Sequence, residues 1–176
     1  MIRVVGVKGR IKNRDDFIRK VEEYSKSLNV AIQVVDANLV YSFNHLYSAA
    51  QHAIRAMRRG TNSMKSLAME ILLYAAGERQ IKNAIEKIGV KENSKSFVFI
   101  IVDDVADIKD ARGKISDKDI DKMLEELHLF KNDSMLKGDK KILERFGISK
   151  NELDTVGEDR YEKLILEKVA MVDILK

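Results

Sequence analysis

The spacing of apolar residues near the start of the chain changes from that of a strand to that of a helix. The segment Ile2–Lys8 is rich in β-branched residues and ends at Gly9, which is typical of a strand. From Arg14 to Leu28, apolar side chains recur every three or four residues, and Asn13 is placed to cap a helix. Ala31–Val35 is again short and apolar. The pattern predicts that the chain opens with a strand, a helix and a second strand.

The middle of the chain has the spacing of helices. One long helix is predicted over Asn38–Arg59, with a single apolar stripe. The stripe consists of Leu39, Phe43, Leu46, Ala50, Ile54 and Met57. Two further helices are predicted over Met64–Ala76 and Gln80–Ile88. Gly89 and the apolar Val90 after the second of these indicate a Schellman ending.

The last third of the chain combines one buried strand with several helices. Ser96–Val102 is apolar at every position after its first, which predicts a central strand that is covered on both faces. Helices are predicted over Asp117–Phe130, Lys140–Phe146 and Asp159–Leu175. The expected fold is α/β (mixed α+β): one domain over residues 1–176, with a small central sheet of about three or four strands packed by six or seven helices.

Composition narrows the possible classes of protein. The 176 residues include no Cys and no Pro, so an intrachain disulfide, a thiolate nucleophile and a cysteine-ligated metal site are excluded. Hydrophobic residues make up 45% of the chain, which excludes a disordered chain. The longest apolar runs, Phe97–Val102 among them, are far shorter than the ~20 residues that span a bilayer. The first residues indicate a strand and not a signal peptide. We therefore expect a cytoplasmic location.

Charge is distributed unevenly along the chain. The net charge is +4, but residues 1–102 carry +8 and residues 103–176 carry −4. From Ala37 to Met69 there is no Asp or Glu. The basic residues in this stretch and just beyond it are Arg55, Arg58, Arg59, Lys65, Arg79 and Lys82. Cations without neighbouring carboxylates are free to bind phosphate. An ordinary solvated basic face explains the same pattern, and both interpretations stay open.

Histidine and aspartate residues are the other candidates for a catalytic or metal-binding site. Helical spacing places His45 and His52 near Arg55 and Arg59, off the core stripe. A metal or catalytic role is disfavoured there, because the helix supplies no further ligand and no orienting carboxylate. A second group, Asp103, Asp104 and Asp107, follows the buried strand. Such a cluster could hold magnesium, although a solvated loop is the favoured interpretation.

The centre of the chain resembles a known family. The run Ser66–Ile81 (SLAMEILLYAAGERQI) and its continuation Ala84–Val90 (AIEKIGV) are similar to the small regulatory subunit of the KEOPS complex, the PRPK-binding (TPRKB-like) family in its archaeal type. The surrounding order also fits. The strand Ile32–Asp36 precedes these residues, and the strand Phe97–Asp103 and the terminal helix around Leu164–Val172 follow them.

The resemblance implies a binding role. KEOPS places a threonylcarbamoyl group on the adenosine next to the anticodon of certain tRNAs. Its regulatory subunit has no catalytic site and no cofactor. That subunit binds and stimulates the complex's small atypical kinase/ATPase, holds tRNA including the 3′ CCA end, and acts indirectly on the threonylcarbamoyl-transferase subunit.

Residue roles follow from this resemblance as hypotheses. We expect the six basic residues named above to contact tRNA phosphates. Tyr74 or Tyr47 is expected to stack on bases. Exposed apolar residues of the helix Asn38–Arg59 and of the terminal helix are expected to contact the kinase, with Met171 and Leu175 named on the latter. The alternative function is that of a small α/β metal-dependent enzyme that uses the three aspartates, with a pocket beside them.

Overall fold

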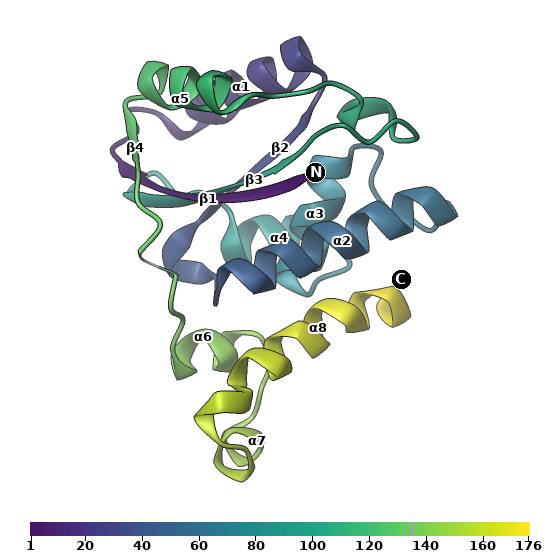
Figure 1. Cartoon of the computed structure of the whole chain (residues 1–176). Coiled ribbons are helices and arrows are strands. Elements are labelled where there is room, and N and C mark those ends of the chain that lie inside the picture. Colours follow the sequence, from purple (N-terminus) through teal and green to yellow (C-terminus); the bar gives the residue numbers. More distant parts are fainter. Residues whose placement is uncertain (135) are drawn as a thin grey trace.

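A four-stranded antiparallel sheet forms the centre of the protein. The computed structural model describes residues 1–134 and 136–176 (Figure 1). The strands are β1 (Ile2–Gly9), β2 (Ala31–Asp36), β3 (Ser96–Val102) and β4 (Leu129–Lys131), and their order in the sheet is β2-β3-β1-β4. The predicted α/β class is therefore confirmed, and so is the predicted number of strands.

Helices cover both faces of this sheet. The described residues form α1 (Arg14–Leu28), α2 (Phe43–Arg59), α3 (Leu67–Ala76), α4 (Ile81–Ile88), α5 (Asp117–Glu126), α6 (Lys140–Arg145), α7 (Lys150–Thr155) and α8 (Tyr161–Leu175). Short 3₁₀ turns occupy Ala37–Leu39, Lys109–Ala111 and Glu158–Arg160. Figure 1 shows α1 and α5 on one face, α2, α3 and α4 on the other, and α8 packed beyond α2. None of the helices in this described part is long and apolar enough to cross a membrane.

The strand β3 divides the core into two parts. It pairs with β1 from Ile2↔Val102 to Lys8↔Ser96, and with β2 on its other side. Side chains alternate along a strand. Phe97, Phe99 and Ile101 accordingly join the cluster under α1 and α5, and the residues between them join the larger cluster under α2 and α3. The prediction of a central strand that is buried on both faces is confirmed.

Two predicted helices begin later than expected because side chains cap different amides. Asp36 accepts a hydrogen bond from the Asn38 amide, which starts a 3₁₀ turn, and Ser42 then caps α2 through the amide of His45. In the same way Ser66 caps α3, so that helix begins at Leu67 and not at Met64.

Helix α7 was not predicted, although the sequence contains its start signal. Ser149 and Glu152 form a capping box, in which each side chain accepts a hydrogen bond from the backbone amide of the other. The helix is only six residues long and buries Leu153. The helix is therefore too short for its apolar residues to form a recognisable stripe. The capping box is the local feature that identifies the helix.

The predicted helix Asp117–Phe130 is wrong in its last part. The capping box of Ser116 and Asp119 does start α5. The helix stops at Glu126, and His128 takes a positive φ of 57°. The chain then forms β4, in which Leu129 pairs with Gly9 of β1. Pairing with a strand distant in sequence determines this ending, and local spacing contains no signal of it.

The end of α4 also differs from the prediction. Gly89 has φ −64° and ψ 159°, so the left-handed conformation of a Schellman motif is absent there. Instead, Lys91 Nζ donates to the carbonyls of Ile85 (3.0 Å) and Glu86 (2.7 Å), and Arg145 Nη2 donates to that of Lys87 (2.8 Å). The extended Gly89 forms a bridge to Val35 at the edge of the sheet. Cationic side chains thus satisfy the last carbonyls of the helix.

His45 lies in the core and not on the basic face, which corrects the sequence-based placement. Its side chain is fully buried, and its ring makes a T-shaped contact with that of Phe146. Nδ1 accepts a hydrogen bond from the Tyr41 amide (3.2 Å), which assigns the proton to Nε2, 2.7 Å from the Ala75 carbonyl. Burial lowers the pKa of His45 to about 4, against the opposing effect of the Ala75 hydrogen bond.

This shift predicts a loss of stability in mild acid. The pKa of His45 is lower in the fold than in the unfolded chain, so the unfolded chain binds the proton first as the pH falls. The contribution is complete above about pH 6.5 and is lost towards pH 4, and at pH 5 the loss amounts to about 2 kcal/mol. Urea unfolding at pH 7 and pH 5 should show a larger drop for the wild type than for His45→Gln. Equal drops would contradict a neutral, buried ring.

Candidate partner-binding surfaces

Five of the six basic residues singled out from the sequence are exposed and form no ion pair within the described residues. Arg55 and Arg59 are exposed on α2, and Lys65, Arg79 and Lys82 are exposed on α4 or on the segments before α3 and α4. In residues 1–134 and 136–176, no carboxylate lies within ion-pair distance of any of these five side chains. We call these five residues the basic face. They can meet phosphate without first breaking an ion pair.

Arg58 is the exception. Its Nε and Nη2 atoms donate to the two carboxylate oxygens of Asp107, at 2.7 and 3.1 Å. The hydrogen bond from Arg58 lowers the pKa of Asp107. The stretch Ala37–Met69 contains no Asp or Glu, but the fold brings a carboxylate to Arg58 from a loop 49 residues away in the sequence. A phosphate would have to displace Asp107 to reach Arg58.

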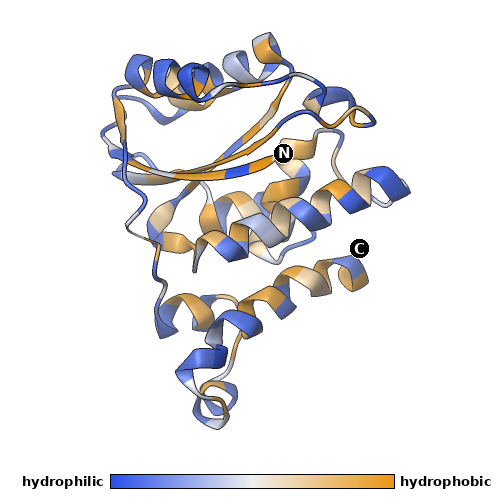
Figure 2. Ribbon diagram, in the orientation of Figure 1, coloured by the Kyte–Doolittle hydropathy of each residue, from blue (hydrophilic) through white to orange (hydrophobic). Residues whose placement is uncertain are grey.

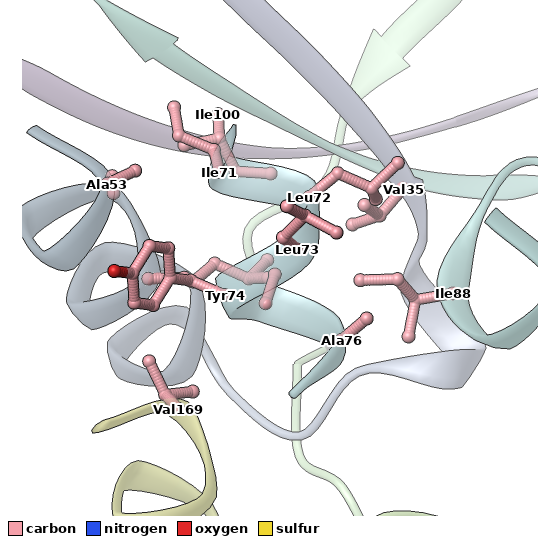
Figure 3. Packing of buried hydrophobic residues seen from close by; sticks show 14 of the residues in the cluster. Val35, Ala53, Ile71, Leu72, Leu73, Tyr74, Ala76, Ile88, Ile100 and Val169 are labelled. Atoms are coloured by element: carbon pink, nitrogen blue, oxygen red, sulfur yellow. The ribbon is translucent and has the colours of Figure 1, made fainter. Parts of the chain in front are cut away.

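The aromatic candidates differ in exposure. Tyr74 is fully buried between α2 and α8, close to Ala53 and Val169 (Figure 3). In this conformation it cannot stack on a base. Tyr47 is 42% exposed on α2 and keeps an accessible ring. Of the two, only Tyr47 remains a candidate for stacking.

The end of α8 presents apolar side chains to solvent. Met171 is 43% exposed, Ile174 79% and Leu175 44%. We call these three residues the apolar tip; Figure 2 shows the apolar residues along α8. Val169 and Val172 on the opposite side of the helix are fully buried. Surplus apolar surface of this kind is typical of a contact site.

The apolar tip adjoins one residue of the basic face, Arg79. Arg79 Nη1 donates to the carbonyl of Leu175 at 3.4 Å. On the other side of α8, His52 of α2 lies 3.1 Å from the Asp173 carboxylate, and its ring stacks on Tyr74. Sequence spacing contains no sign of this juxtaposition, because α8 follows α2 by more than 100 residues. Both surfaces were predicted separately from the sequence.

Sequence reasoning missed one polar residue in this region. Glu70 of α3 is fully buried, and its carboxylate accepts hydrogen bonds from the amides of Ser63 and Met64 and from Nζ of Lys176. Glu70 is the first acidic residue after the acid-free stretch, and a lone carboxylate at such a position indicates that the carboxylate has a specific partner. The sequence could not identify Lys176 as that partner.

The three aspartates after β3 do not converge. Asp103 is buried and pairs with Arg3 (2.9 Å) while accepting from the Ile115 amide (3.0 Å). Asp104 lies 3.7 Å from Lys114, and Asp107 pairs with Arg58 as described above. Each carboxylate thus has a different cationic partner. Within the described ranges, no three His, Asp or Glu side chains gather in a way that could hold a metal ion.

Two hollows of the described molecule are lined by residues other than these three aspartates. One of about 480 Å³ runs between α1, β2 and α3, with Phe17, Val21 and Leu72 among its lining residues. A smaller one of about 230 Å³ lies beside Val4 and Phe43. Neither is lined by the three aspartates. The pocket that the enzyme hypothesis required beside them is not among these hollows.

Comparison with known families defines the class of protein. The family described as "Kinase binding protein CGI-121" matches residues 9–173, which is nearly the whole chain. The chain therefore shares its class with the proteins of that family. It belongs to the CGI-121 family, and the resemblance seen in the sequence is confirmed.

Individual relatives support the same family. The chain is 34% identical over 91 residues to "KEOPS complex subunit Cgi121" of Pyrococcus abyssi, covering 49% of this chain and 53% of that protein. It is 33% identical over 72 residues to "Regulatory protein Cgi121" of Methanocaldococcus jannaschii, covering 41% and 47%. A fungal relative, "EKC/KEOPS complex subunit CGI121" of Coccidioides immitis, is 24% identical over 74 residues, covering 42% and 36%. The matched part spans about half the length of the archaeal relatives.

The exposure of the apolar tip predicts different costs for two neighbouring substitutions. Ile174→Ser should change the free energy of unfolding by less than about 0.5 kcal/mol, because the side chain is already in water. Val172→Ser should cost about 2 kcal/mol or more, because it leaves a cavity and buries a hydroxyl. Urea unfolding of both variants measures this difference. A large loss for Ile174→Ser would show that the tip is part of the core.

Proposed function

We propose that this protein is a non-catalytic regulatory subunit of the KEOPS tRNA-modification complex. The observation that carries the proposal is the match of nearly the whole chain to the kinase-binding family, together with relatives that are named as KEOPS subunits. Two adjoining surfaces of different chemistry support a binding role. The subunit would bind and stimulate the kinase/ATPase of the complex through one of them and hold tRNA through the other.

The apolar tip is the surface we assign to the kinase. Protein interfaces are centred on apolar side chains that lose contact with water on binding. Met171, Ile174 and Leu175 form such a centre, and the buried side of α8 holds them against α2 and α3. The residues proposed from the sequence, Met171 and Leu175, are thereby joined by Ile174, the most exposed of the three.

The basic face is the surface we assign to tRNA. Phosphate contacts give an affinity that falls steeply with salt and depends little on base sequence. Arg79 adjoins the apolar tip, and the other four cations extend the face along α2 and the segments around α3 and α4. The exposed ring of Tyr47 supplies a stacking platform for unpaired bases such as those of the 3′ CCA end.

Kinase binding should depend on the apolar tip. The double variant Met171→Glu/Ile174→Glu is expected to weaken binding to the KEOPS kinase of the same organism at least about tenfold, because charge is placed at the centre of an apolar contact. Phe130→Glu is the matched control, since Phe130 is 68% exposed but lies on β4. Calorimetry gives the affinity and ATP hydrolysis gives the stimulation. Equal binding by the tip variant and the control would exclude the tip as the contact.

Binding of tRNA should depend on salt and on the basic face. Arg59→Glu/Lys82→Glu is expected to lower the affinity and to reduce the slope of log affinity against log salt by about one for each phosphate that the variant no longer binds. Lys20→Glu/Lys118→Glu makes the same change in net charge on α1 and α5, across the sheet, and should have little effect.

The same salt series distinguishes the two interpretations of the basic face. Intact tRNA should bind more tightly than tRNA that lacks its CCA end. Absence of wild-type binding at low salt would make the basic face an ordinary solvated surface and leave the kinase contact as the main role.

A further inference from the structure

Glu70 and Lys176 form a buried ion pair that joins two distant segments. Glu70 is fully buried on α3, and one of its carboxylate oxygens accepts hydrogen bonds from the amides of Ser63 (3.0 Å) and Met64 (2.9 Å). The other oxygen accepts from Nζ of Lys176, which follows the last turn of α8. The side chain of Lys176 is only 9% exposed although its backbone is at the surface. A lysine is rarely buried to this degree without a partner.

The pair continues into a network that fixes the last turn of α8. Lys176 Nζ also donates to the hydroxyl of Tyr74 (3.0 Å) and lies 4.3 Å from the centre of its ring. The Tyr74 hydroxyl donates in turn to Asp173, whose other oxygen meets His52. Burial and the hydrogen bond to Asp173 raise the pKa of Tyr74, so this hydroxyl stays protonated and remains a donor.

Asp173 and Lys176 flank two of the three residues of the apolar tip along the chain. Met171 precedes Asp173, and Ile174 and Leu175 lie between the two anchored residues. Helix ends otherwise fray, and the exposed Ile174 makes few packing contacts that would hold this turn. The same Glu70 carboxylate binds the segment before α3, which contains Lys65 of the basic face. One buried carboxylate therefore contacts elements of both surfaces.

We propose that Glu70 and Lys176 are positioning residues, which hold the apolar tip in place beside the basic face so that the kinase meets a preformed surface. Preformed contacts bind more tightly because less conformational freedom is lost on association. This inference rests on the proposed function in one respect, namely that the apolar tip is the kinase contact. The buried pair itself is a feature of the free protein and is testable alone.

Amine acylation tests the pair without any partner. In the wild-type protein, Lys176 should react with N-hydroxysuccinimide acetate about tenfold or more slowly than the exposed Lys163 of α8, as followed by mass spectrometry. In Glu70→Gln, an acceptor oxygen remains for the amides of Ser63 and Met64, but the charge that holds Lys176 is lost. Lys176 should then react nearly as fast as Lys163. Equal rates in the wild type would overturn the proposal.

Kinase affinity tests the positioning role. Lys176→Met keeps the length and apolar stem of the side chain but lacks the charge, and it should weaken kinase binding about fivefold or more. Lys176→Arg keeps the charge and should remain within about threefold of the wild type. The thermal midpoint of each variant shows whether the variant has lost its fold. The pH dependence of stability that His45 confers should also be the same in both variants as in the wild type. Wild-type affinity in Lys176→Met, or equal losses in both variants, would overturn the positioning role.

Failure of the proposed function is distinguishable from failure of this inference. If the wild-type protein does not bind the kinase, the proposed function fails. The acylation rates still decide whether the pair holds Lys176. If the wild type binds and Lys176→Met binds equally well, the proposed function stands and the positioning role falls.

Discussion

The structure depends on the burial of α3 from nearly every side. Eight of its ten residues are buried, against the sheet, α2, α4 and α8. A helix that is apolar all round can be satisfied only at the centre of a layered structure. It therefore dictates that α2 and α4 flank it and that α8 closes the remaining side. Figure 3 shows this arrangement around Ile71, Leu73 and Tyr74.

The two polar groups of this buried helix impose further constraints. The Glu70 carboxylate and the Tyr74 hydroxyl each require a partner, because an unpaired buried polar group is costly. The amides before α3 supply one set of partners, and Asp173 and Lys176 supply the other. The end of α8 is therefore placed by the polar requirements of α3 as well as by the apolar contacts of its own buried side.

Local chemistry made most of the fold predictable, and contacts between distant segments explain the errors. Asn13 and Ser116 mark helix starts by side-chain capping, and the continuous apolar run of β3 marks a strand that is covered on both faces. Pairing with β1, in contrast, converts the predicted end of a helix into β4. His45 is drawn into the core by partners on either side of its ring, and Asp107 reaches Arg58 from a loop that follows β3. The identity of the basic residues was predictable from the sequence, whereas their pairing and the closeness of the apolar tip were not.

Charge is distributed unevenly between the two faces of the sheet, and both proposed partner surfaces lie on the less acidic side. Helix α2 contains no Asp or Glu, whereas α5, on the opposite face of the sheet, contains five acidic residues among its ten. A polyanion is attracted to the first side and repelled from the second, and the effect extends about 8 Å at physiological ionic strength. The apolar tip lies on the attractive side, next to Arg79. A tRNA drawn to the basic face would thus arrive beside the surface proposed for the kinase. The difference that matters in the folded protein is therefore the one between the acid-free α2 and the acidic α5, which lie on opposite faces of the sheet.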